Sequence, residues 1–266
     1  MHIKRLNLKG LRNTRDLGGM PTKDGGVIAK GKLLRSGKLY KLPEETVKAL
    51  REYGVTTIVD LRIFTECDET PDTLWDEAEY YHLPILCTAT PGITREKSMC
   101  RTMSIESRRI KSEFGNADNY MIEMYRSILF SEEPKRHLKD VLRMIIDNEG
   151  CILWHCSAGK DRAGIVAMLV ESLLGVDDKT IIQDYTMSKQ FLRRKFFWNK
   201  FGLRIVPLKR RFKKILIAMM EAKPEYLLSP IREIEQKYGS VTEYCKAELG
   251  VTDADIARMK EKYLIY

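Results

Sequence analysis

The chain has 266 residues, of which 44% are hydrophobic and 9% aromatic, so it can bury the core of one domain. That composition argues against a disordered chain, and no apolar stretch is long enough to cross a membrane. The formal net charge of +9 favours an anionic partner, which leaves phosphorylated substrates, acidic membrane surfaces and nucleic acid as candidates.

The first half of the chain alternates between strand and helix patterns. Short strands are predicted around residues 27–29 and 33–35, next to glycine-containing turns. A helix is predicted over 43–53, because a proline opens it and two glutamates follow in its first turn. The β-branched, apolar run 56–61 is typical of a buried strand, and 80–85 predicts another.

The second half continues the alternation. Residues 117–148 have helical periodicity interrupted at Pro134, so two helical pieces are expected. The apolar run 151–155 predicts a strand, and the run 164–174, after a glycine-containing loop, predicts a helix. Three further helices are predicted, over 225–238, 241–249 and 252–263. This alternation favours an α/β fold in which helices flank a central, mostly parallel sheet.

A strongly basic segment covers residues 189–214, with eleven lysines and arginines and six interleaved aromatic residues. One interpretation is a mobile lid that gathers anionic substrate; the other is a helical subdomain with a solvated basic face and a buried aromatic face. We favour the second for the aromatic residues, although the charge still requires an anionic partner. The chain is therefore expected to be a single domain, 1–266, with a basic helical lid or insertion around 189–223 and a C-terminal helical portion over 224–266.

The six cysteines are irregularly spaced and include no Cys-x-x-Cys pair and no Cys/His cluster. Neither a metal site nor a cofactor is therefore expected. The first residues contain no apolar segment typical of a secretory signal, so we expect a cytoplasmic protein with free thiols. Export by a route that needs no such signal stays open.

The clearest functional pattern lies in residues 151–164, where a strand is followed by Cys-x5-Arg and a helix start. The loop reads His155-Cys156-Ser157-Ala158-Gly159-Lys160-Asp161-Arg162. Five residues between Cys156 and Arg162 let the backbone curl, so that its N–H groups and the positive end of the helix bind one anion. The same field favours a thiolate on Cys156, and the planar guanidinium of Arg162 can grip phosphate oxygens. Such a thiolate can attack phosphorus and form a phosphocysteine without a metal.

Structural interpretations compete with these roles. A lone cysteine is usually a small apolar core residue, and that interpretation is preferred for the other five cysteines. It does not suit Cys156, because a core cysteine does not require Ser-Ala-Gly-Lys-Asp-Arg at a strand-to-helix turn. For His155 both interpretations stay open: it orients the loop and tunes the thiolate, or it fills space in the core.

The loop resembles the signature of cysteine-based protein-tyrosine and dual-specificity phosphatases. Its Gly-Lys-Asp-Arg core resembles the bacterial protein-tyrosine/serine phosphatases, including phosphoinositide-active members. The similarity covers most of the chain and is weak over 88–115 and 189–223. Further matching segments are Asn-Thr-Arg-Asp-Leu-Gly-Gly at 13–19, Leu-Arg-Ser-Gly at 34–37, Val-Asp-Leu-Arg at 59–62, Asp184 with Tyr185 and Ser188, the pair Glu-Tyr at 225–226 and the triplet Tyr-Gly-Ser at 238–240.

This resemblance implies a phosphatase fold and hydrolysis of phosphotyrosine, with phosphoserine, phosphothreonine or phosphoinositides as substrates of some members. It makes Cys156 the nucleophile and Arg162 the phosphate clamp. Lys160 is expected to add positive charge at the rim of the site, which suits highly phosphorylated substrates such as inositol lipids. The backbone of five residues would complete the phosphate cradle: Ser157, Ala158, Gly159, Lys160 and Asp161.

One departure from the family pattern follows the loop. Ala163 stands where the superfamily usually has serine or threonine, whose hydroxyl stabilises the thiolate and helps to release the phosphocysteine. We therefore predict slower breakdown of the covalent intermediate.

A second departure concerns the general acid. Residues 86–92, which follow the predicted 80–85 strand, contain no acid, although some family members have an aspartate there. Asp161 is then the first candidate for protonating the leaving oxygen, and Asp60 is the second. A loop-stabilising acceptor is an equal alternative for Asp161. For Asp60 an ion pair with a nearby arginine, Arg15 or Arg62, is preferred.

The sequence therefore predicts a cysteine-dependent phosphomonoesterase that acts on phosphorylated proteins or peptides. Inositol phospholipids are a further candidate, with anionic surface contact through 189–214. Three alternatives were weighed. A phosphate-binding module with little turnover is motivated by Ala163 and the missing acid, whereas sulfur transfer or arsenate reduction fits this loop less well. Nucleic-acid binding is not expected, because no recognised module is present.

Overall fold

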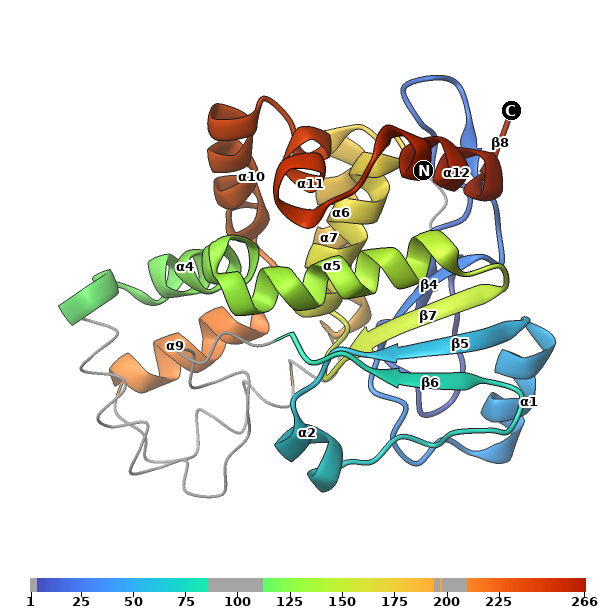
Figure 1. Cartoon of the computed structure of the whole chain (residues 1–266). Helices are drawn as coiled ribbons and strands as arrows, with labels where there is room; N and C mark the ends of the chain where they lie inside the picture. Colours follow the sequence, from blue (N-terminus) through green and yellow to red (C-terminus); the bar gives the residue numbers. More distant parts are fainter. Residues whose placement is uncertain (1–3, 86–111, 194–196, 198–209) are drawn as a thin grey trace.

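We describe a computed structural model of the chain over residues 4–85, 112–193, 197 and 210–266 (Figure 1). Its main sheet contains β1 (Lys4–Arg5), β2 (Arg15–Asp16), β4 (Leu33–Gly37), β5 (Val55–Asp60), β6 (Glu79–His82) and β7 (Cys151–Cys156). The strand order is β1-β2-β4-β7-β5-β6. β4, β7, β5 and β6 run parallel, whereas β1 and β2 pair antiparallel at one edge. The expected central, mostly parallel sheet is confirmed.

Helices lie on both faces of this sheet. Because successive strand residues point to opposite faces, Val59 and Trp154 join one buried cluster while Ile58 and Leu153 join another. The second cluster includes Leu50 of α1 (Glu44–Glu52), and the first is the larger one. The larger cluster takes side chains from α4 (Ala117–Phe130), α5 (Glu132–Asp147), α6 (Arg162–Leu173), α7 (Asp178–Phe191), α9 (Arg210–Met220), α10 (Pro224–Tyr238), α11 (Val241–Leu249) and α12 (Asp253–Tyr263).

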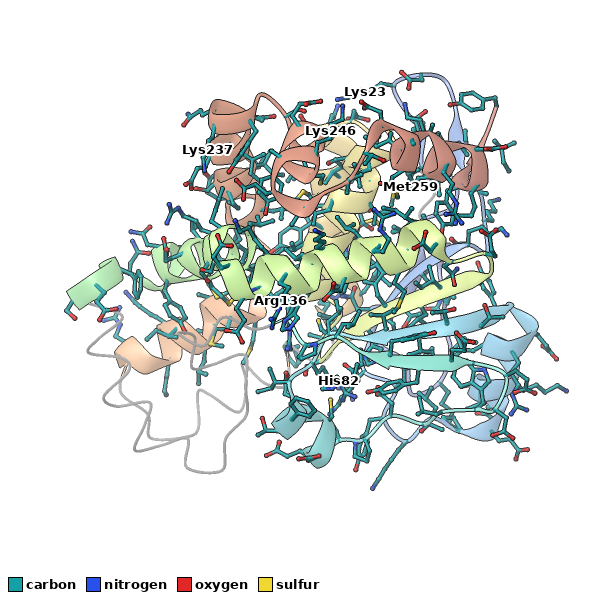
Figure 2. All side chains as sticks on the ribbon, viewed as in Figure 1. Lys23, His82, Arg136, Lys237, Lys246 and Met259 are labelled. Carbon is teal, nitrogen blue, oxygen red and sulfur yellow. The ribbon has the colours of Figure 1, made fainter. Side chains whose placement is uncertain are left out.

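The C-terminal residues are tied back to the N-terminal part of the chain. β8 (Leu264–Ile265) pairs antiparallel with β3 (Val27–Ile28) in a second, two-stranded sheet. Met259 of α12 is buried in the larger cluster, and Figure 2 shows it on the side of α12 that faces α5. The C-terminal helices therefore share the core of the sheet domain.

Most predicted elements are present with shifts of one or two residues at their ends. The break between α4 and α5 was wrongly predicted at Pro134; it lies at Ser131, and Pro134 sits in the first turn of α5. A proline is tolerated there because the N–H that it lacks would have no partner within the helix. The pattern did not predict α2 (Phe64–Glu69) or α7, and both contribute to the site described below.

Two further expectations concern the basic segment 189–214 and membrane-spanning helices. Most of the basic segment 189–214 lies outside the described residues, so the choice between lid and subdomain is not tested. Over the described ranges, no helix combines the length and the apolar character of a membrane span.

The carboxyl ends of the parallel strands meet at one edge of the sheet. Gly37 of β4 is in register with Cys156 of β7, and Asp60 of β5 is in register with both His155 and His82. α2 leaves the sheet at this edge, below the ends of β5 and β6 in Figure 1. Residues far apart in the sequence therefore converge around the loop that follows β7.

Candidate active site

The Cys156–Arg162 loop joins the central strand β7 to α6. β7 is buried along its whole length, and α6 begins at Arg162 with nearly all its residues buried. Gly159 has a φ of +65°, and a Cβ there would lie 2.5 Å from the backbone of Ser36. Only glycine fits at this position. The tight packing against β4 thus sets the curvature of the loop.

Two side chains hold the loop through its carbonyl oxygens. The amide of Asn13 donates to the carbonyls of Ala158 and Gly159, at 3.0 and 2.8 Å. Arg35 donates to the carbonyls of Gly159 and Lys160, at 3.0 and 3.1 Å. In a trans peptide the N–H points away from the carbonyl. Because these carbonyls point outward, the N–H groups of the same peptides point toward the inside of the loop, where an anion would sit.

Asp184 of α7 anchors both arginines that lie behind the loop. Its carboxylate accepts from Arg15 at 2.6 Å and from Arg35 at 2.5 Å. Burial alone would raise the pKa of Asp184, but the two guanidinium groups hold it below its ordinary value. Ser188, one turn later on α7, contacts Asn13 and Arg15. The separate motifs at 13–19, 34–37 and 184–188 therefore form one scaffold for the loop.

Arg162 is held by a carboxylate that the sequence reasoning missed. Its two terminal nitrogens contact Glu66 of α2 at 2.7 and 2.9 Å, and Ser157 Oγ also donates to Glu66. Burial opposes charge on Glu66, but Arg162 lowers its pKa below the ordinary value. The buried Nε of Arg162 has no hydrogen-bond partner among the described residues. The two terminal nitrogens of the Arg162 guanidinium are thus fixed by Glu66, and its Nε remains available to donate to an anion. The signal for Glu66 was weak: an acid four residues after Arg62.

Lys160 is not at the rim of the site, contrary to the expectation. Its side chain is buried, and Nζ donates to the carbonyls of Met219 and Glu221, at 2.7 and 2.6 Å. These carbonyls lie at the C-terminal end of α9, where a helix carries partial negative charge. Nζ also lies 3.2 Å from Oδ1 of Asp161. Lys160 therefore joins the loop to α9.

Asp161 lies beside this contact and keeps partial access to solvent. Its side chain is 16% exposed. Oδ1 accepts a hydrogen bond from the hydroxyl of Tyr125, at 2.5 Å. Asp161 directly precedes Arg162 in the loop, and the hydrogen bond from Tyr125 fits either interpretation of its role, as proton donor or as loop-stabilising acceptor.

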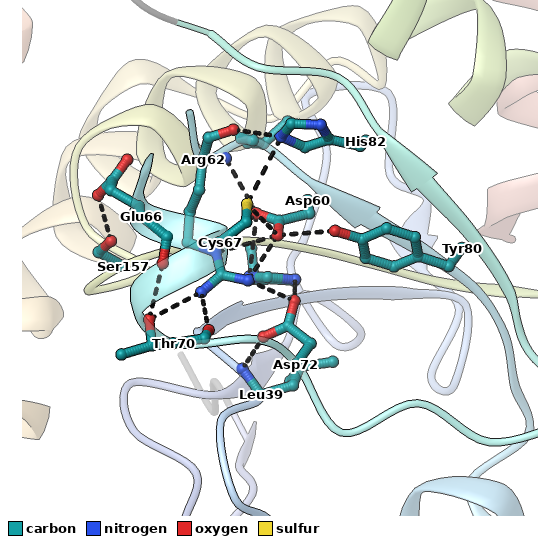
Figure 3. Close-up of polar contacts among 12 residues, drawn as sticks. Leu39, Asp60, Arg62, Glu66, Cys67, Thr70, Asp72, Tyr80, His82 and Ser157 are labelled. Carbon is teal, nitrogen blue, oxygen red and sulfur yellow. Dashed lines mark hydrogen bonds and ion pairs between the residues drawn. The ribbon is translucent and has the colours of Figure 1, made fainter. Parts of the chain in front are cut away.

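Asp60 lies in a closed polar cluster next to the loop (Figure 3). The guanidinium of Arg62 contacts it at 2.6 to 3.0 Å, and Tyr80 and Cys67 also donate to it. Its side chain is fully buried. Burial opposes the charge, yet His155 and Arg62 hold the pKa of Asp60 well below its ordinary value. The preferred interpretation of Asp60, an ion pair with an arginine, agrees with this geometry; the partner is Arg62.

His155 is fully buried between two carboxylates. Its Nε2 lies 2.9 Å from Asp72 Oδ2 and its Nδ1 lies 3.7 Å from Asp60 Oδ1, although neither nitrogen makes an aligned hydrogen bond within the described residues. Ligand atoms of Asp60, Asp72 and His155 lie within 4.8 Å of one another. Arg62 already contacts both carboxylates, at 2.6 and 2.7 Å, so its charge disfavours a metal ion there.

The other cysteines that the structure describes are poor nucleophiles. Burial raises the pKa of Cys67 and of Cys151 to about 12 in each case, and that of Cys245 further still. All three are free thiols. Cys87 and Cys100 lie outside the described residues. Ala163 is buried, and its carbonyl accepts from the indole of Trp154 at 3.1 Å.

The fold and the loop together define a cysteine-based phosphatase, and comparison with known proteins agrees. Residues 6–265 match the tyrosine phosphatase family. A putative tyrosine-protein phosphatase of Cupriavidus necator is 26% identical over 262 residues, which cover 96% of this chain and 86% of that protein. The triple specificity protein phosphatase PtpB of Mycobacterium tuberculosis is 26% identical over 272 residues, which cover 95% and 96%. The chain belongs to the tyrosine phosphatase family.

Proposed function

We propose that this phosphatase hydrolyses phosphotyrosine through a phosphocysteine on Cys156. The observation that carries the proposal is the loop itself: the carbonyls of residues 158–160 are held outward by Asn13 and Arg35. The inward N–H groups and the unpartnered Nε of Arg162 then provide donors for one phosphoryl group. Cys156 stands at the strand end where that group would bind.

The reaction we propose has two steps. The thiolate of Cys156 attacks phosphorus, a P–S bond forms, and the bond from phosphorus to the ester oxygen breaks. Asp161 gives a proton to the leaving oxygen. Water then attacks the phosphocysteine, Asp161 takes a proton from that water, and inorganic phosphate leaves as the thiolate is regenerated. Asp60 is a poor candidate for this proton because Arg62 and His155 hold it ionised.

The second step is expected to be the slow one. Ala163 places a methyl group where a hydroxyl would assist release of the thiolate, and this position is buried. Phosphocysteine should therefore accumulate. A burst of the phenol product before steady state, measured by stopped flow with an aryl phosphate, would support this; strictly linear release at saturating substrate would count against it.

Substrate range is part of the proposal. Besides phosphotyrosine we propose phosphoserine, phosphothreonine and inositol phospholipids, supported by the net charge of +9 and by the similarity to PtpB, which is named for triple specificity. Lys160 does not support lipid recognition, since its ammonium is bound to α9. The basic residues of 189–214 are the better source of positive charge. We propose that 189–223 serves the single phosphatase domain as a lid or insertion.

The test is phosphate release from a small aryl phosphate in EDTA, comparing the wild-type chain with Cys156→Ser. Turnover that the substitution abolishes would support the thiolate mechanism without a metal. Cys151→Ser is the matched control, because this thiol lies at the other end of the same strand. If the wild-type chain releases no phosphate but still binds vanadate, the phosphate-capturing alternative replaces this proposal.

A further inference from the structure

Two buried tyrosines form a hydroxyl chain that ends on Asp161. Tyr125 comes from α4 and Tyr185 from α7, and their hydroxyl oxygens lie 2.7 Å apart. Tyr125 gives its only hydroxyl hydrogen to Oδ1 of Asp161. Tyr185 must therefore donate to Tyr125. Hydrogen bonds in such a chain polarise one another, which strengthens the contact to the carboxylate.

The surroundings keep both tyrosines rigid and neutral. Their rings meet edge to face, with centroids 6.0 Å apart, and both side chains are buried. Burial, and then the charge of Asp161, raise the pKa of Tyr125 and of Tyr185 well above the ordinary value. Each hydroxyl is thus a permanent donor over the pH range of a phosphatase assay.

The two oxygens of Asp161 have different surroundings. Oδ1 receives Tyr125 and lies 3.2 Å from the ammonium of Lys160. For Oδ2, no hydrogen bond is found within the described part of the chain. Two contacts on one oxygen restrict rotation of the carboxyl group, and the second oxygen is left for proton exchange.

We propose that Tyr125, supported by Tyr185, is a positioning residue that orients Asp161 so that Oδ2 exchanges the proton with the leaving oxygen and with water. The inference rests on the proposed function of Asp161. It predicts that the hydroxyl of Tyr125 matters most for substrates whose leaving group requires protonation. An activated ester such as p-nitrophenyl phosphate requires it little, whereas phenyl phosphate requires it strongly.

The experiment compares Tyr125→Phe with Tyr226→Phe on these two esters. Tyr226 is the matched control: its ring lies 6.3 Å from that of Tyr125, but its hydroxyl bonds to Asp118. For Tyr125→Phe we expect kcat/KM on phenyl phosphate, which reports the step in which the leaving oxygen is protonated, to fall about tenfold, part of the 10²–10⁴ that a general acid supplies. On p-nitrophenyl phosphate the loss should stay within about twofold. Tyr226→Phe should leave both rates near wild type.

Two further variants decide between positioning and a general structural effect. Tyr185→Phe removes only the second donor, so it should give a smaller loss on phenyl phosphate in the same sense. With Asp161 replaced by Asn, the addition of Tyr125→Phe should cost nothing more. Equal losses on the two esters, or additive losses in the double variant, would overturn the inference while the thiolate mechanism stands. Absence of Cys156-dependent turnover in the wild type would overturn both proposals.

Discussion

Asp60 and Asp161 are both carboxylates at the catalytic edge of the sheet, yet their surroundings differ. Asp60 is fully buried and receives donors from Arg62, Tyr80 and Cys67. Asp161 is partly exposed, and among the described residues its contacts lie on Oδ1 only. A carboxyl group that exchanges protons needs one oxygen without a fixed hydrogen-bond donor. A buried carboxylate with a structural role instead needs hydrogen-bond donors for both of its oxygens. The comparison separates a structural carboxylate from a candidate acid.

The largest expected effect is on folding, with Asp60→Asn. This substitution removes one of the two carboxylates that contact the buried guanidinium of Arg62 and leaves Asp72, so the loss should lie toward the lower end of the about 3–5 kcal/mol that breaking a buried ion pair costs. The free energy of unfolding in urea measures it. Asp68→Asn, on the exposed face of α2, should change it by less than about 0.5 kcal/mol. A loss below about 1 kcal/mol for Asp60→Asn would remove the contrast with Asp161.

Asp161→Asn should act on turnover instead. We expect kcat/KM on phenyl phosphate to fall at least about 100-fold, because the amide cannot donate a proton to the leaving oxygen. Unfolding in urea should change by less than about 1.5 kcal/mol, the usual value of one hydrogen bond. Unchanged kcat/KM would assign Asp161 to loop stabilisation, which is the alternative interpretation of this residue.

Glu66→Gln tests a carboxylate between these extremes. It keeps the size of the side chain but removes the charge that holds the fork of Arg162. Weakening of this charge-assisted contact should lower kcat/KM about tenfold. Glu69→Gln, which changes an exposed residue of the same helix, is the matched control. Equal activities of the two variants would show that Arg162 needs no anchor.

The smallest effect concerns Glu171, which is buried behind the loop near Asp184. Burial, and then the charge of Asp184, raise the pKa of Glu171 well above its ordinary value of 4.5. The native chain therefore retains a proton that the unfolded chain releases, so stability is complete below about pH 4.5 and declines as the pH rises. Glu171→Gln should remove this decline, so its free energy of unfolding should rise relative to that of the wild-type chain between pH 5 and pH 8. Parallel pH profiles for both chains would contradict it.

Local patterns were sufficient for most elements and for the loop, although not for α2 and α7. β7, the loop and α6 are consecutive in the chain, so the strand, the Cys-x5-Arg spacing and the helix start could be read together. The helix predicted over 252–263 begins with a capping box of Thr252 and Asp255, a local contact whose partners are three residues apart. Pro134 misled the prediction, since the same residue suits a first turn and a break equally well.

The sequence by itself therefore determined the α/β class, and it predicted the phosphate-binding loop and the nucleophile that we propose. Only the tertiary structure decided what holds that loop. Glu66 and Arg162 are 96 residues apart, and Asn13 is 146 residues from Gly159. Lys160 was placed wrongly for the same reason: its partners lie at the end of α9, 59 and 61 residues away. Periodicity and spacing describe neighbours along the chain, whereas these contacts depend on how separate helices pack on the sheet.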